Sequence, residues 1–157
     1  MCGISGVLSD KENNSIDIKR TAAIMSSILS HRGPDDSGLW INPENICAMS
    51  HSRLAIIDLS SAGHQPMNSQ CGLYTIVFNG EIYNHHHLKV ELERSKLCNS
   101  IWKGHSDTEI LLEAIRVWGL KKALQKSNGM FAIALWDHKK KRLSLARDRL
   151  GEKPLYF

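Results

Sequence analysis

MCGISGVL, residues 1–8, places a cysteine directly behind the initiator methionine and follows it with two glycines. Two interpretations of Cys2 compete. Free cysteine packs like a small apolar side chain, so Cys2 can be an ordinary buried residue at the start of a β-strand. In the other interpretation Met1 is removed, and Cys2 carries a thiol and the α-amine on one residue. These eight residues alone favour the buried residue, and the rest of the sequence has to decide.

The composition is that of one globular domain. Of 157 residues, 42% are hydrophobic and 23% charged, so we expect a single domain over residues 1–157. No apolar run approaches the roughly 18 residues of a membrane span, and no signal peptide is indicated. The chain is therefore expected to be cytoplasmic, without a membrane partner. The scattered cysteines form no CxxC pair, which argues against a zinc ribbon or redox motif; they are Cys2, Cys47, Cys71 and Cys98.

Much of the net charge of +4 lies in one run, HKKKR, at residues 138–142. Such a run can be a nucleic-acid patch or a solvated hairpin turn. It stands between two alternating apolar stretches, FAIALWD and RLSLARD, and no aromatic platform accompanies it. We therefore expect a turn and no nucleic-acid partner.

Apolar periodicity predicts strands on both sides of a helical middle section, which indicates an α+β domain. The clearest helix signal is the capping box Ser106-Asp107-Thr108-Glu109, followed by ILLEAIRVW and stopped by Gly119. The sequence predicts strands over residues 2–8, within 39–57, over 73–78, 130–136 and 143–146, and helices over residues 17–29 and after Ser106.

Three polar clusters interrupt these elements: HRGPDDSG (31–38), SHSRLAIIDL (50–59) and FNGEIYN (78–84). The first is explained as a loop that ends the preceding helix. Arg53, in the second, can point into solvent or offer a planar fork to a carboxylate. In the third, Asn79-Gly80 is first of all a hairpin turn signal. The same pair can also supply two N–H donors to one oxyanion.

Two further features have a structural and a functional interpretation. Asp107 opens a helix, where the dipole favours a carboxylate, and in a pocket it could hold an ammonium group. The histidines at positions 85–87 suggest a metal site, but adjacent side chains point in different directions. A solvated helix start explains them better, and no metal is expected.

A thiol nucleophile needs a base, and the spacing of the histidines does not define a Cys–His pair. An N-terminal Cys2 meets this need by itself, because its α-amine has a reference pKa near 8. The chemistry that fits is acyl transfer, in which a thiolate attacks a carbonyl and water hydrolyses the thioester.

Eight motifs stand in the order seen in class II glutamine amidotransferase domains, and together they cover residues 2–157. The sequence most resembles the N-terminal glutaminase domain of glutamine-hydrolysing asparagine synthetases. The resemblance reverses the interpretation of Cys2 in favour of the nucleophile. The motifs are MCGISG, HRGPDDSG, SHSRLAIIDLS, GHQPM, FNGEIYN, SDTEILLEA, GMFAIALWD and LARDRLGEKPLYF.

The resemblance implies catalytic roles for three residues. Cys2 is similar to the family's N-terminal nucleophile, whose free amine is the general base. Asn79 and Gly80 resemble the oxyanion hole, through the side-chain amide and the backbone N–H.

The resemblance also implies a binding site for L-glutamine. Arg53 matches the arginine that clamps the α-carboxylate, and Asp107 matches the aspartate that receives the α-ammonium. Glu81 is a further contact, and the main chain at Ile56 and Ile57 lines the site.

The implied fold is the N-terminal nucleophile hydrolase sandwich, two antiparallel sheets between helical layers. We expect it to be incomplete at its C-terminal end, because the family's domain usually continues for a few more strands. The chain is then either truncated or completed by a partner, and an unpaired strand edge is expected.

The family's synthetase half is absent, and with it the loop for ATP pyrophosphate chemistry. ATP and magnesium would belong to that half, so we expect no cofactor for glutamine hydrolysis. The expected partners are L-glutamine and a synthetase domain or subunit that receives ammonia, with aspartate as the default acceptor.

The sequence thus predicts hydrolysis of L-glutamine to glutamate and ammonia through a thioester on Cys2. The alternative is a catalytically silent fragment of the same fold that acts as a binding or regulatory module, which retention of Met1 would favour. A third hypothesis, hydrolysis of another amide, is disfavoured because Arg53 and Asp107 suit a free amino acid.

Overall fold

The structure is a computed structural model of the chain, and it describes residues 2–9, 17–95 and 101–157. Removal of Met1 and the state of Cys98 therefore lie outside the described residues. The described cysteines, Cys2, Cys47 and Cys71, are free thiols.

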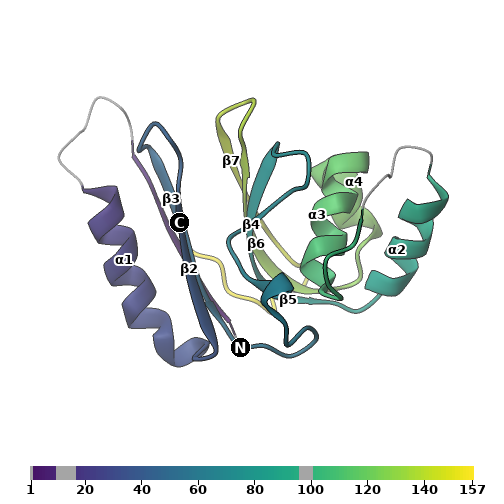
Figure 1. Cartoon of the computed structure of the whole chain (residues 1–157), viewed down its shortest axis with the longest axis horizontal. Coiled ribbons are helices and arrows are strands. Elements are labelled where there is room, and N and C mark those ends of the chain that lie inside the picture. Colours follow the sequence, from purple (N-terminus) through teal and green to yellow (C-terminus); the bar gives the residue numbers. More distant parts are fainter. Residues whose placement is uncertain (1, 10–16, 96–100) are drawn as a thin grey trace.

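Two antiparallel sheets face each other, and each carries helices on its outer side (Figure 1). Helix α1 covers the first sheet, while α2, α3 and α4 cover the second. The first sheet has the order β1 (Gly3–Leu8), β3 (Cys47–Arg53), β2 (Asp36–Ile41). The second has the order β4 (Met67–Asn68), β5 (Tyr74–Ile82), β6 (Gly129–Asp137), β7 (Arg142–Arg147). The helices are α1 (Ile18–Ile28), α2 (His85–Arg94), α3 (Asp107–Trp118) and α4 (Leu120–Lys126), with 3-10 turns at Leu29–Arg32 and Ser61–Gly63.

Successive side chains of a strand point to opposite faces of its sheet, so the second sheet contributes residues to two hydrophobic cores. In β5, Val77 packs between the sheets with Met49 and Trp136. Its neighbours Ile76 and Phe78 belong to the larger core beneath the helices of the second sheet. Helix α3 is buried over most of its length because it lies between that sheet and the two other helices. The α+β sandwich predicted from the sequence is confirmed.

The structure corrects the prediction that the strand ends at Asn79-Gly80. Strand β5 runs on to Ile82, and β6 pairs with it through Gly80 and beyond. A Cβ at Gly80 would lie 2.2 Å from the carbonyl oxygen of Met130 on β6. The glycine is there because the two strands approach closely, and pairing with β6 overrides the local turn preference.

Other local predictions hold. Ser106 caps α3 by accepting a hydrogen bond from the N–H of Glu109 at 3.2 Å. The Glu109 carboxylate accepts instead from the N–H groups of Lys103 and Gly104, so the reciprocal half of the capping box is not formed. The basic run forms the turn between β6 and β7 at residues 138–141, as predicted, and its last residue, Arg142, begins β7.

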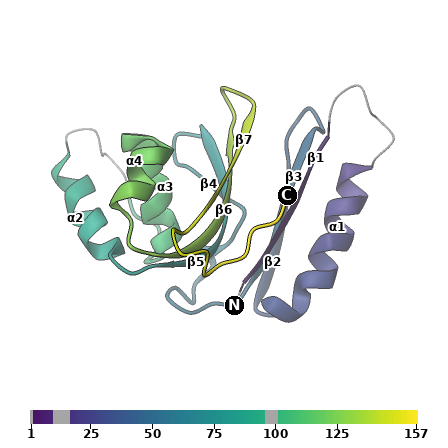
Figure 2. The ribbon, with the colours of Figure 1, turned by 180° about the vertical axis from the view of Figure 1, so that it is seen from behind.

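The C-terminal segment leaves β7 and crosses from the second sheet toward the first (Figure 2). No strand is assigned between residues 148 and 157, and β1 lies at an edge of its sheet. Completion of either sheet by further strands stays a prediction.

Candidate active site

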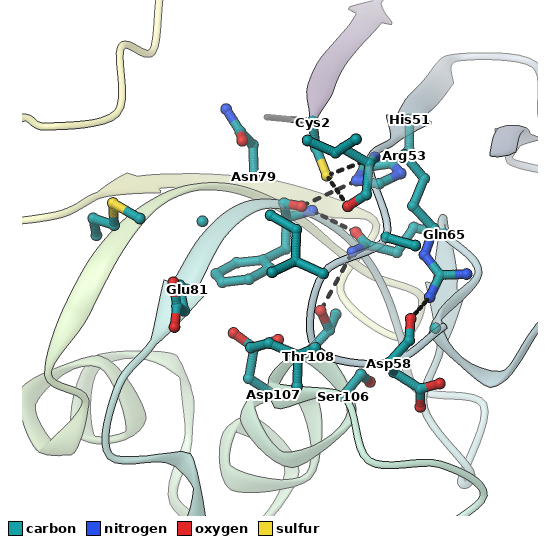
Figure 3. A pocket seen from close by; sticks show the side chains of 18 residues that line it. Cys2, His51, Arg53, Asp58, Gln65, Asn79, Glu81, Ser106, Asp107 and Thr108 are labelled. Atoms are coloured by element: carbon teal, nitrogen blue, oxygen red, sulfur yellow. Dashed lines mark hydrogen bonds between the residues drawn. The ribbon is translucent and has the colours of Figure 1, made fainter. Parts of the chain in front are cut away.

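One pocket is lined by both sheets and by the N-terminus of α3 (Figure 3). In the close view Cys2 and Asn79 lie at one end of it, Asp107 and Thr108 at the other, and Arg53 on a side wall. All eight residues singled out from the sequence line this pocket: Cys2, Arg53, Ile56, Ile57, Asn79, Gly80, Glu81 and Asp107.

The thiol of Cys2 is held by the backbone of one residue, Leu54, which directly follows β3. Its Sγ accepts a hydrogen bond from the N–H of Leu54 at 3.4 Å and lies 3.6 Å from the Leu54 carbonyl oxygen, to which it can donate. The antiparallel pairing of β1 with β3 brings these residues together across 52 positions of sequence. The half-buried sulfur is thereby oriented at the pocket wall.

His51 lines the same pocket, and its environment makes it a weak base. Its Nε2 lies 3.1 Å from the carbonyl oxygen of Phe78, and because a carbonyl only accepts, Nε2 must carry the proton. Burial lowers the pKa of His51 to about 4, so the ring is neutral at physiological pH. His51 therefore supports a strand carbonyl and does not form a Cys–His pair suited to neutral pH.

Asn79 is positioned by its place on β5. It is two residues from Val77 and so shares the face that looks toward the first sheet, where Cys2 lies. The side chain is buried, and Gly80 follows it at the close approach to β6. A side-chain amide near a thiol in a buried setting is what stabilisation of an oxyanion requires.

Arg53 ends β3 and is buried, with 8% of its surface exposed. Its Nη1 donates to the Ser60 carbonyl at 2.9 Å, and its Nη2 donates to the Asp58 carbonyl. A guanidinium carries five N–H donors, so two bonds to the loop leave donors for a carboxylate. Gly63 packs directly against the guanidinium.

Asp107 is the first residue of α3 and is buried, with 5% exposed. Its Oδ2 accepts a hydrogen bond from the N–H of Ile82 at 2.8 Å. Loss of solvent raises the pKa of Asp107, an effect that the Ile82 bond only partly opposes. An ammonium group bound here would offset the cost of burying the carboxylate.

The loop that carries Ile56 and Ile57 is fastened by Asp58. One carboxylate oxygen accepts from the hydroxyl of Ser60 at 2.6 Å and from its N–H at 2.8 Å, and the other accepts from the N–H of His105 at 2.7 Å. These bonds hold the pKa of Asp58 at about 2. The loop is thereby tied to the segment before α3.

The HRGPDDSG cluster, to which the sequence assigned no chemistry, holds the same region from the other side. Asp35 accepts a hydrogen bond from the N–H of Ala55 at 2.8 Å. The Oδ2 atom of Asp36 lies 2.7 Å from Nδ1 of His64, the second residue of the GHQPM segment.

Several pocket residues escape sequence reasoning. His51, Gln65 and Thr108 all line the pocket and are all buried. Each stands inside a quoted motif, but nothing in a motif's letters shows which side chain faces inward. The only signal in the sequence is that each is a polar residue inside such a motif.

The other candidate features carry no site. Among the described residues, no group of three or more His, Cys, Asp or Glu side chains could hold a metal ion. Helix α2 begins at His85, whose Nδ1 lies 2.8 Å from the Ile82 carbonyl oxygen, as a helix start predicts. In the described part of the chain, no helix has the length and apolar character needed to cross a membrane.

A family model described as a glutamine amidotransferase domain matches residues 1–157. The chain belongs to the glutamine amidotransferase domain family. Asparagine synthetase [glutamine-hydrolyzing] 3 of Bacillus subtilis is 40% identical over 164 residues, which cover all of this chain and 25% of that protein. Asparagine synthetase B of Escherichia coli is 37% identical and is covered to 27%. Amidase chry2 of Gibberella zeae is 34% identical and is covered to 24%.

This amidotransferase domain therefore spans about a quarter of the length of these relatives. Among solved structures, glutamine phosphoribosylpyrophosphate amidotransferase from B. subtilis superposes with a TM-score of 0.71 at 20% identity. The match covers 94% of this chain and 37% of that one. It confirms the N-terminal nucleophile hydrolase fold.

Proposed function

We propose that this chain hydrolyses L-glutamine to glutamate and ammonia through a thioester on Cys2. The observation that carries the proposal is the convergence of complementary groups in one pocket. A thiol and an amide donor lie at one end, a buried carboxylate lies at the other, and a buried guanidinium forms the wall between them. The names of the asparagine synthetase relatives state that they hydrolyse glutamine, which supports this substrate.

Two of these groups match the two charged substituents on the α-carbon of a free amino acid. Arg53 would bind the α-carboxylate and Asp107 the α-ammonium, because a zwitterion needs one cation and one anion. Glu81 and the main chain at Ile56 and Ile57 would complete the contacts. The γ-carboxamide is then directed toward Cys2.

The reaction requires that Met1 be removed. The α-amine of Cys2 then takes the thiol proton, and the thiolate attacks the γ-carbonyl carbon. The side-chain amide of Asn79 and the N–H of Gly80 stabilise the oxyanion. The protonated amine returns its proton to the leaving nitrogen, so ammonia departs and a thioester remains. Water then attacks the thioester, releasing glutamate and restoring the thiol.

The proposed destination of the ammonia is a synthetase domain or subunit, with aspartate as the acceptor suggested by the relatives' names. Hydrolysis as written uses only the chain's own groups and water. ATP and magnesium would serve the synthetase part.

The decisive experiment measures ammonia release from L-glutamine by the purified chain, with the N-terminal residue identified by mass spectrometry. Cys2→Ala should abolish release, whereas Cys71→Ala is a matched control, because Cys71 is exposed and does not line the pocket. Wild-type chain with a free Cys2 amine that binds glutamine without releasing ammonia would contradict the proposal and favour a silent binding module.

A further inference from the structure

The side-chain amide of Gln65 bridges the two ends of the pocket. Its Oε1 accepts a hydrogen bond from the N–H of Phe78 at 2.7 Å, and its Nε2 donates to Oγ1 of Thr108 at 3.3 Å. Gln65 is buried, with 5% exposed. Phe78 directly precedes Asn79, and Thr108 directly follows Asp107. One side chain thus contacts the neighbours of both proposed binding groups.

The pairing of the sheet explains why Phe78 is available to Gln65. Strand β4 pairs with β5 only at Thr75 and Ile76, and because it begins at Met67, opposite Ile76, it does not extend to the position opposite Phe78. In an antiparallel pair, alternate residues turn their N–H and C=O to the same side. The Phe78 groups therefore point toward the position that a longer β4 would occupy, and buried backbone groups need partners there.

Two side chains take the place of the missing strand. Gln65 accepts from the Phe78 N–H, and His51 donates to the Phe78 carbonyl at 3.1 Å. His51 belongs to the opposite sheet, whereas Gln65 also contacts helix α3. The backbone of Phe78, next to Asn79, is consequently held at both its N–H and its C=O by buried side chains.

We propose that Gln65 is a positioning residue that sets the spacing between the oxyanion end of the pocket at Asn79 and the ammonium end at Asp107. This inference rests on the proposed function. The side chain of glutamine has a limited reach from its α-carbon to its γ-carbonyl, so the two ends of the pocket must be spaced to bring the carbonyl to the reacting groups. A displacement of about 1 Å at a reacting centre can cost roughly a hundredfold in rate.

The test compares two substitutions at this position. Gln65→Met keeps the length of the side chain and removes both hydrogen bonds. Gln65→Glu keeps both, because a carboxyl oxygen accepts from the Phe78 N–H and the Thr108 hydroxyl can donate to, or accept from, the other oxygen. We expect Gln65→Met to lower kcat by about 10- to 100-fold with KM changed less than about threefold. Gln65→Glu should restore most of kcat. Gln125→Met, in an exposed position on α4, is the matched control.

A second readout does not depend on activity. Amide hydrogen exchange followed by NMR should show at least a tenfold faster exchange at Phe78 in Gln65→Met, with Ile76 and Leu135 unchanged. Equal loss of protection at all three amides would show general loosening of the sheet and overturn the positioning role. A Gln65→Met chain with wild-type kcat would overturn it too, while leaving the proposed function intact. A wild-type chain without ammonia release overturns the proposed function itself, and the positioning role falls with it.

Discussion

Gly63→Ala tests whether the proposed binding of the substrate carboxylate by Arg53 depends on how tightly the guanidinium is packed. A Cβ at Gly63 would lie 2.2 Å from Nη2 of Arg53 and 2.8 Å from its Cζ, whereas ordinary contact begins at 3.4 Å. The difference, 3.4 − 2.2, requires the guanidinium to move by about 1.2 Å. The backbone of Gly63 does not have a positive φ, so alanine adds bulk there without backbone strain.

A movement of this size carries the guanidinium away from the loop. The bond to the Ser60 carbonyl, 2.9 Å long, and the bond to the Asp58 carbonyl would both be lost or badly bent. Hydrogen bonds to charged groups contribute about 1.5–3 kcal/mol each, and the clamp on the substrate carboxylate shifts by the same distance. We expect KM for glutamine to rise about 10- to 100-fold, which corresponds to roughly 1.4–2.8 kcal/mol.

Ammonia release measured against glutamine concentration checks this prediction. Because Gly63 does not contact Cys2 or Asn79, kcat should stay within about threefold of wild type. Arg53→Ala should raise KM by at least as much, and Ser61→Ala, an exposed neighbour in the same 3-10 turn, should change nothing. A Gly63→Ala chain with wild-type KM, or with reduced kcat at unchanged KM, would refute the reasoning.

Two other predictions concern buried carboxylates. Burial raises the pKa of Asp107, so folding disfavours its ionised form. Asp107→Asn should therefore raise the melting temperature at neutral pH. The same substitution should raise KM for glutamine about tenfold or more. Wild-type KM should also rise as pH falls through that raised pKa; a lower melting temperature for the variant would contradict the first part. Bonds from Ser60 and His105 hold the pKa of Asp58 at about 2, below its ordinary value of 3.8. The ionised carboxylate therefore contributes fully to stability above pH 3.8, and this contribution is lost as the pH falls toward 2. Between pH 5 and 2, the free energy of unfolding measured with urea should therefore fall less steeply with decreasing pH in Asp58→Asn than in the wild type. Equal slopes for the two proteins would contradict this assignment.

Local signals were sufficient where a few adjacent residues decide the structure. Ser106 caps α3 and Asp107 begins it, as the capping box predicts, because both signals act within one helical turn. The same reasoning failed at Asn79-Gly80, since a turn preference of two residues is weaker than pairing along the whole of β6.

The site could be predicted as a set of residues but not as a set of contacts. The family resemblance singled out Cys2, Arg53 and Asp107, and the structure places all three on the lining of one pocket, while their roles stay a prediction. Gln65 stood in a quoted motif without a role, because its partners lie 13 and 43 positions away and depend on where β4 begins. Such contacts follow from the arrangement of strands, which no short pattern records.

Cys2, the proposed nucleophile, directly precedes β1 of the first sheet, whereas Asn79, the proposed oxyanion donor, lies on β5 of the second. The distance between them therefore depends on how the two sheets pack against each other. Trp40 and Trp136 meet across the interface between the sheets with ring centroids 6.1 Å apart. Any sliding of one layer over the other would change the gap between Cys2 and Asn79 without altering either residue. The rate of the proposed reaction should therefore depend on residues in the apolar interior between the sheets. A substrate that contacts both sheets would also oppose their separation during mechanical or thermal unfolding.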